Sequence, residues 1–216
     1  MTRFITFSNA RRSLLRFGSD ECGASLVEFA LVVTLFLFLL LGIIDFGRIG
    51  HAWVGANKAT QLAARIAAVR PPACPDVPLF NQRGTAVSPP AYGALCRAGS
   101  GVCLTPSPAT STCQGVATNA TAQEIFTAVR PLLPAGTTIG QMRYSYAFDP
   151  NLGFLGGPYV PMVTVELTGV NFTFISRLGF FVTALTGQNS TLGTPLSLPG
   201  MSVSLPGEDL ASGMDG

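Results

Sequence analysis

The residues with the clearest chemical potential open a long apolar run, in the sequence GASLVEFALVV. Glu28 places a carboxylate at the start of this run, five residues after Gly23 and directly before Phe29. Because an unpaired charge is costly in lipid, such a carboxylate either reaches the interface or has a cationic partner. At the far end of the run, Asp45 and Arg48 have the three-residue spacing of neighbours on one helix face. We predict an interfacial ion pair there, with a solvated helix end as the alternative.

Cysteines form the second group of reactive side chains. Cys22 precedes the apolar run, and the other four follow it: Cys74, Cys96, Cys103 and Cys113. An even number of cysteines in an oxidising compartment predicts two disulfides, with three possible pairings. The pairing that we prefer is Cys74–Cys96 with Cys103–Cys113. A zinc site is the alternative, but the short C-x-x-C spacings are missing, so no metal is expected.

The sequence contains no pattern that is typical of an active site. His51 is the one histidine of the chain, and no cysteine or carboxylate accompanies it at metal-ligand spacing. The nucleophile-elbow, P-loop and dinucleotide-binding glycine motifs are absent. Acidic residues beyond the apolar run are scattered, and no basic patch remains there for nucleic acid. We therefore expect no enzyme activity, no cofactor, no small-molecule substrate and no nucleic-acid partner.

A transmembrane helix is the first element that would position these residues, and we expect it at 24–44. Charged residues make up only 11% of the chain, and this segment has a single one, Glu28. At ~1.5 Å per helical residue, it is long enough to cross the ~30 Å hydrocarbon core. Four arginines precede the segment: Arg3, Arg11, Arg12 and Arg16. By the positive-inside rule, the N-terminus is cytoplasmic and the rest lies on the other side. A cleaved secretory signal fits poorly, because the run is too long and ends in IIDFGRIG.

A second helical segment is expected at 45–70, in continuation of the first. Alanines and Ile66 recur at helical spacing on one face, whereas Lys58 and Arg65 lie off that face. Pro71 and Pro72 end the helix, because proline lacks the N–H group and disfavours helix in the residue before it. The alternative is two separate helices with a loop at 47–50.

The remaining chain divides into a Cys-, Pro- and Gly-rich external region at 71–119 and a β-rich domain at 120–216. Residues 120–129 predict a short helix that ends before Pro131. Alternating apolar and polar residues at 141–148, 160–174 and 200–206 predict strands of an antiparallel sheet with one polar face. The segment 175–186 fits either a short apolar helix or a buried loop. The expected fold class is α+β: a long N-terminal helix followed by a small antiparallel sheet.

Residues 23–48 resemble the N-terminal segment of TadE-like pseudopilins of the tight-adherence (Flp, type IVb) pilus systems of bacteria. The resemblance rests on a glycine, a Glu-Phe pair in the fifth and sixth places after it, an unbroken apolar helix and a closing DFGR. Type II secretion pseudopilins share the glycine and the glutamate. They usually have an aromatic residue after the glycine, where this chain has Ala24.

The resemblance implies proteolytic processing on the cytoplasmic face of the membrane. A prepilin peptidase would cut between Gly23 and Ala24, which would make 1–23 a removable basic leader. Glu28 would then lie one turn, about 6 Å, from the new amino group of Ala24. It could neutralise that amine or the amine of a neighbouring subunit, with Phe29 beside it in the assembly motif.

The function implied by this family is that of a minor pseudopilin, a structural component that supports type IVb pilus biogenesis, secretion and adhesion. Its expected location is the bacterial inner membrane as a single-pass protein, with a periplasmic or extracellular C-terminal domain, and in association with the pilus. The expected partners are prepilin peptidase, other pilins and pseudopilins, and the Tad inner-membrane assembly machinery. The alternative is an uncleaved, membrane-anchored periplasmic binding or adhesion protein.

Overall fold

The computed structural model describes residues 21–86, 88, 90–175, 179, 182–183, 186–188, 191, 193–208 and 210. The predicted leader therefore lies outside the described residues except for its last three positions, and so does much of 175–186. The chain forms two compact units. We call Met1–Gly47 with Ile175–Gly193 the anchor unit, and Arg48–Phe174 with Thr194–Gly216 the sheet unit.

One α-helix, α2 (Glu21–Val69), contains both predicted helical segments. It is continuous through residues 47–50, so the alternative with a loop there is wrong. Gly47 and Gly50 each weaken a helix by only about 1 kcal/mol relative to alanine, which is too little to interrupt one of this length. The helix ends at Val69, one residue short of the predicted end at Arg70, whose helical conformation Pro71 disfavours.

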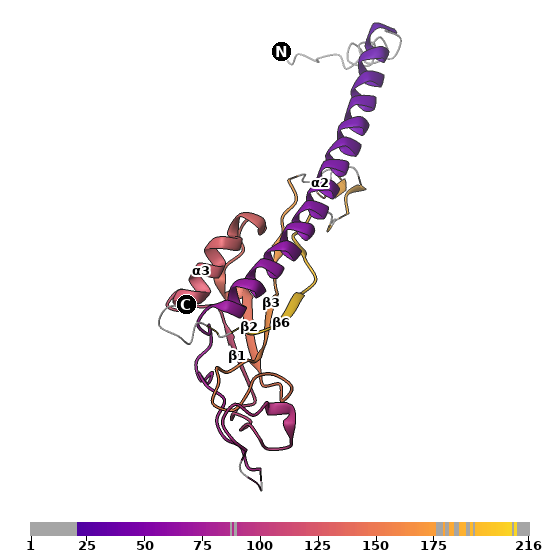
Figure 1. Ribbon diagram of the computed structural model, residues 1–216. Helices are drawn as coiled ribbons and strands as arrows, with labels where there is room; N and C mark the ends of the chain where they lie inside the picture. Colours follow the sequence, from indigo (N-terminus) through magenta and orange to yellow (C-terminus); the bar gives the residue numbers. More distant parts are fainter. Residues whose placement is uncertain are drawn as a thin grey trace, which may run out of the picture. The chain divides into compact units, whose positions relative to one another are not determined.

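The sheet unit is built on a four-stranded antiparallel sheet in the order β1-β2-β3-β6 (Figure 1). Its strands are β1 (Thr110–Gln114), β2 (Met142–Ala147), β3 (Met162–Leu167) and β6 (Met201–Pro206). A second, two-stranded sheet pairs β4 (Asn171–Phe172) with β5 (Leu196–Ser197). The alternating segments of the sequence thus form strands, and the predicted α+β fold class is confirmed.

Strand β1 was not predicted from the sequence. Its residues, TSTCQ, lie inside the Cys-, Pro- and Gly-rich region at 71–119, where we predicted no strand. The strand pairs with β2 along its whole length, with Cys113 opposite Tyr144. A polar edge strand has little hydrophobic alternation of its own. Its extended conformation therefore depends on backbone hydrogen bonds to a strand that is distant in the sequence.

A short helix, α3 (Ala120–Val129), forms where the sequence predicted one. The side chain of Asn119 accepts a hydrogen bond from the Ala122 N–H, which caps the first turn. Its apolar face buries Ile125 and Val129. Short 3₁₀ turns lie before and after it: η1 (Cys96–Ala98), η2 (Arg130–Leu132) and η3 (Ile139–Gln141).

The core of the sheet unit lies between the sheet, α3 and the alanine face of α2. Tyr144 and Tyr146 of β2 and Val163 and Val165 of β3 are almost fully buried. The alanines of α2 that share this core are at most 1% exposed: Ala56, Ala59, Ala63, Ala64 and Ala67. The small side chains of the helix leave room for the bulky tyrosines of β2 in this core.

Candidate functional site

The sequence-predicted assembly motif forms the first turns of α2. Gly23, Glu28 and Phe29 are all exposed, and a methyl group added at Gly23 would meet nothing within 4 Å. Packing against the described residues therefore does not require glycine at this position.

The apolar stretch that follows is uncovered. Leu26, Leu31 and Phe36 are 59–70% exposed, and none of the most apolar window of the helix is buried. Within the described ranges, α2 is the one helix that is long and apolar enough to cross a membrane. An apolar surface of this extent needs lipid or other helices around it, which indicates a membrane anchor.

Asp45 and Arg48 occupy different surroundings. Asp45 is 2% exposed, and its Oδ1 accepts a hydrogen bond of 3.2 Å from the Ile175 N–H in the anchor unit. In the sheet unit, the Arg48 guanidinium lies 5.1 Å from the centre of the Phe172 ring, a cation–π arrangement. The ion pair between Asp45 and Arg48 stays a prediction.

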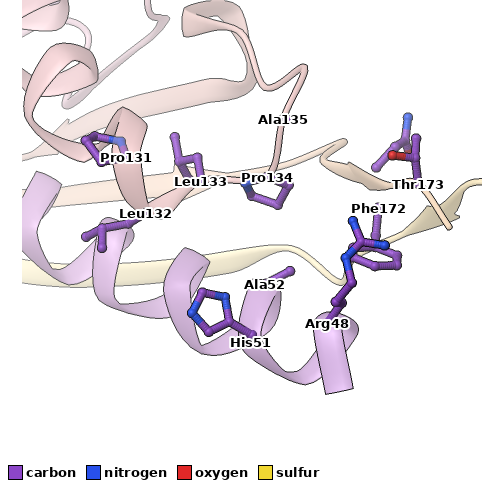
Figure 2. Close-up of a pocket in the computed structure, with 11 residues that line it drawn as sticks. Arg48, His51, Ala52, Pro131, Leu132, Leu133, Pro134, Ala135, Phe172 and Thr173 are labelled. Carbon is purple, nitrogen blue, oxygen red and sulfur yellow. The ribbon is translucent and has the colours of Figure 1, made fainter. Parts of the chain in front are cut away.

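A cavity of about 210 Å³ lies beside Arg48 in the sheet unit (Figure 2). Arg48, His51 and Ala52 of α2 form one side, and residues 131–135 form another. Asn171, Phe172 and Thr173 complete the lining. No pattern around His51 in the sequence predicted this cavity. The sequence feature that could have indicated the cavity is an arginine and the lone histidine, three residues apart and shortly after the apolar run.

The four external cysteines form two disulfides, Cys74–Cys113 and Cys96–Cys103. The prediction of disulfide bonding is confirmed, and the preferred pairing, Cys74–Cys96 with Cys103–Cys113, is wrong. The reason is β1: its pairing with β2 places Cys113 next to the chain that leaves α2. There the Cα atoms of Cys74 and Cys113 are 5.5 Å apart, a normal distance for a disulfide.

The loops around Cys96–Cys103 carry a group of exposed apolar side chains, which we call the loop apolar cluster. Its members are Leu79, Phe80, Tyr92, Leu95, Leu104 and Phe154. Backbone bridges join Phe80 to Pro158 and Leu95 to Phe154, so these loops support one another. In the described part of the chain, no group of three or more His, Cys, Asp or Glu side chains is arranged to hold a metal ion.

These features define the class of the protein: an α+β protein whose N-terminal helix has the properties of a membrane anchor. The family model described as TadE-like protein matches residues 23–65. The match confirms the resemblance seen in the sequence, begins at Gly23 and ends within α2. The matched segment covers about one fifth of the chain and suggests a component associated with the Tad pilus. Comparison with curated proteins and with solved structures finds no match.

Proposed function

We propose that this chain is a minor pseudopilin that supports the assembly of a type IVb (Flp/Tad) pilus and, through it, adherence. The observation that carries this proposal is the TadE-like match, which starts at Gly23 and follows the exposed apolar helix. The protein acts by helix packing in the membrane and in the assembly, without catalysis. Its partners are other pilins and pseudopilins and the Tad inner-membrane machinery.

Processing by a prepilin peptidase is the first step of this function. The peptidase cuts between Gly23 and Ala24 on the cytoplasmic face and releases the basic leader. The exposure of Gly23 and the open space around it support access for another protein. Cleavage removes Cys22 and leaves the four disulfide-bonded cysteines in the mature chain.

The proposed topology places the N-terminus in the cytoplasm and the sheet unit in the periplasm or outside the cell. Four arginines before the apolar run support this orientation. The two disulfides support it as well, because disulfides persist in oxidising compartments and are rare in the cytosol.

The N-terminus of the membrane-inserted protein tests this function. The full chain, with a C-terminal tag, is expressed together with a prepilin peptidase, and its intact mass and N-terminal sequence are measured. We expect a mature chain that begins at Ala24, and an unprocessed chain for Gly23→Ala. Gly42→Ala is the matched control: Gly42 lies in the apolar part of α2 and, like Gly23, has nothing within 4 Å of an added methyl group, so processing should continue. A wild-type chain that keeps its leader would contradict the proposal.

A second candidate function is an uncleaved, anchored binding or adhesion protein. The loop apolar cluster favours it, because Tyr92 is 74% exposed and Phe80 is 53% exposed on neighbouring loops. Exposed aromatic residues of this kind mark interaction surfaces. The N-terminal measurement separates the two functions, since this one predicts an intact leader.

A further inference from the structure

We propose that the cavity beside Arg48 and His51 binds the phosphate of an anionic phospholipid headgroup. This inference rests on the proposed membrane anchoring of α2, but neither on leader cleavage nor on pilus assembly. It assigns a ligand to the part of the helix that follows the apolar run.

The first argument is the chemistry of the lining. Arg48 and His51 lie three residues apart on α2, a spacing that places their side chains on one helix face. Asn171 and Thr173, with an amide and a hydroxyl group, also line the cavity, and both residues are exposed. Phosphate oxygens accept hydrogen bonds from all four of these groups. None of the described residues that line the cavity is acidic.

The second argument is the level of the cavity along the helix. The apolar run ends at Ile44, and Arg48 and His51 follow it by four and seven residues in the same continuous helix. At ~1.5 Å per residue, they lie about 6 and 10 Å beyond the hydrocarbon boundary, in the headgroup layer. The neighbouring Trp53 is 47% exposed, as expected for an aromatic side chain in that layer.

The third argument is size. The cavity has a volume of about 210 Å³, below the ~300–1,000 Å³ that is usual for sites that enclose a whole small molecule. It accommodates a compact polar group whose remainder stays outside. A lipid headgroup has this form, because its phosphate is attached to chains that lie in the adjacent membrane.

Arg48 can take part although other groups contact it. Its guanidinium lies over Phe172, and Asp45 is the carboxylate that the sequence predicts as its partner. A guanidinium has five N–H donors in one plane, so it can serve a carboxylate, an aromatic face and a phosphate together. The ring contact also limits the positions that Arg48 explores, which favours binding by preorganisation.

The imidazole of His51 reports binding directly, because the chain contains no other histidine. The full chain is held in a neutral detergent, and short-chain phosphatidylglycerol is titrated while the ring signals of His51 are followed by NMR. We expect saturable shifts with phosphatidylglycerol and none with the zwitterionic short-chain phosphatidylcholine. Arg48→Gln should weaken the binding about tenfold or more, the effect of losing one charge-assisted hydrogen bond.

Two further variants distinguish binding in the cavity from non-specific electrostatic attraction to the helix. Lys58→Gln removes an equal charge from an exposed position of the same helix outside the cavity, and should leave the affinity unchanged. Ala135→Phe keeps every charge and fills the cavity from an exposed loop, and should abolish the saturable shift. Circular dichroism confirms that each variant is folded.

Three results would overturn the proposal. The first is the absence of a saturable shift with phosphatidylglycerol. The second is equal affinity in wild type, Arg48→Gln and Ala135→Phe, which would mean non-specific attraction. The third is saturation by inorganic phosphate but not by phosphatidylglycerol, which would exclude a lipid as the ligand. Leader processing is measured separately, so failure here is distinguishable from failure of the pilus function.

Discussion

At the scale of single residues, one polar group of α2 is exposed, whereas one of β2 is buried and hydrogen-bonded. Glu28 is exposed on an uncovered helix, so its role depends on what surrounds that helix. Tyr146 is 1% exposed, and its hydroxyl oxygen accepts a hydrogen bond of 2.9 Å from the Ala73 N–H. This bond joins β2 to the chain that leaves α2. Burial raises the pKa of Tyr146 above its ordinary value, although the bond from Ala73 opposes the shift.

Glu28→Ala should leave membrane insertion and leader processing intact and should impair pilus assembly. In lipid, the amine that the proposed cleavage creates at Ala24, in the same chain or in a neighbouring subunit, would lack a neutralising carboxylate, and the register between packed helices would be lost. Carbonate extraction measures insertion, and electron microscopy of the cells measures piliation. Ser25→Ala, an exposed polar change in the same turns of the helix, is the control. Normal piliation with Glu28→Ala would reduce Glu28 to a tolerated interfacial charge.

Tyr146→Phe should destabilise the sheet unit by about 1–3 kcal/mol, because the buried Ala73 N–H loses its acceptor. Tyr144→Phe is the matched control, since the Tyr144 hydroxyl contacts only the weak acceptor Met142 Sδ at 3.8 Å among the described contacts. It should change the free energy of unfolding by less than about 1 kcal/mol. Urea unfolding of the full chain in a fixed detergent, followed by circular dichroism, measures both. Equal effects would show that the Ala73 bond contributes little.

At the scale of elements, the two halves of α2 differ in the size and the burial of their apolar side chains. Its second half packs a face of alanines and Gly55 against the sheet unit, whereas its first half leaves leucine and phenylalanine uncovered. Gly55 is buried, and a methyl group added there would lie 2.5 Å from the Leu132 carbonyl oxygen of η2. Close packing of this kind, more than helix propensity, determines which residues the second half tolerates.

Gly55→Ala should lower the free energy of unfolding by about 1–3 kcal/mol, because the clash is with backbone that cannot move without shifting η2. Gly50→Ala is its opposite: nothing lies within 4 Å of the added methyl group, so better helix propensity should raise stability by up to about 1 kcal/mol. The same unfolding assay measures both variants. A Gly55→Ala chain that is as stable as Gly50→Ala would mean that α2 and η2 separate readily.

At the scale of the whole molecule, the chain consists of an apolar anchor unit and a disulfide-linked sheet unit. Cys74–Cys113 closes a separation of 39 residues and ties the end of α2 to the edge strand β1. Cys96–Cys103 closes a separation of 7 residues within the loops. Because the longer loop loses more freedom in the unfolded chain, the first disulfide should contribute more to stability.

Removing Cys74–Cys113 by double alanine substitution should lower stability by up to about 4 kcal/mol, the chain-entropy value for a loop of that length. Removing Cys96–Cys103 in the same way should lower it by up to about 2.5 kcal/mol, which makes it the matched control. Thermal unfolding of the oxidised full chain compares the two. A larger loss from Cys96–Cys103 would show that loop closure is not the main source of the stabilisation.

Local patterns in the sequence determined several elements of this protein, but not all of them. The apolar run, the proline pair after Arg70 and the alternation in 141–148 predicted α2, its end and β2, because each signal lies within the residues that fold. The same locality made the segment from Gly23 to Phe29, the predicted assembly motif, recognisable as TadE-like.

Tertiary structure decided everything that depends on residues far apart in the chain. Strand β1 forms because it pairs with β2, and this pairing brings Cys113 close enough to Cys74 for a disulfide. The cavity at Arg48 requires α2, residues 131–135 and residues 171–173 to meet, and no local pattern encodes that meeting. Hydrophobic periodicity is a short-range signal, whereas pairing and cavities arise from the packing of the whole sheet unit.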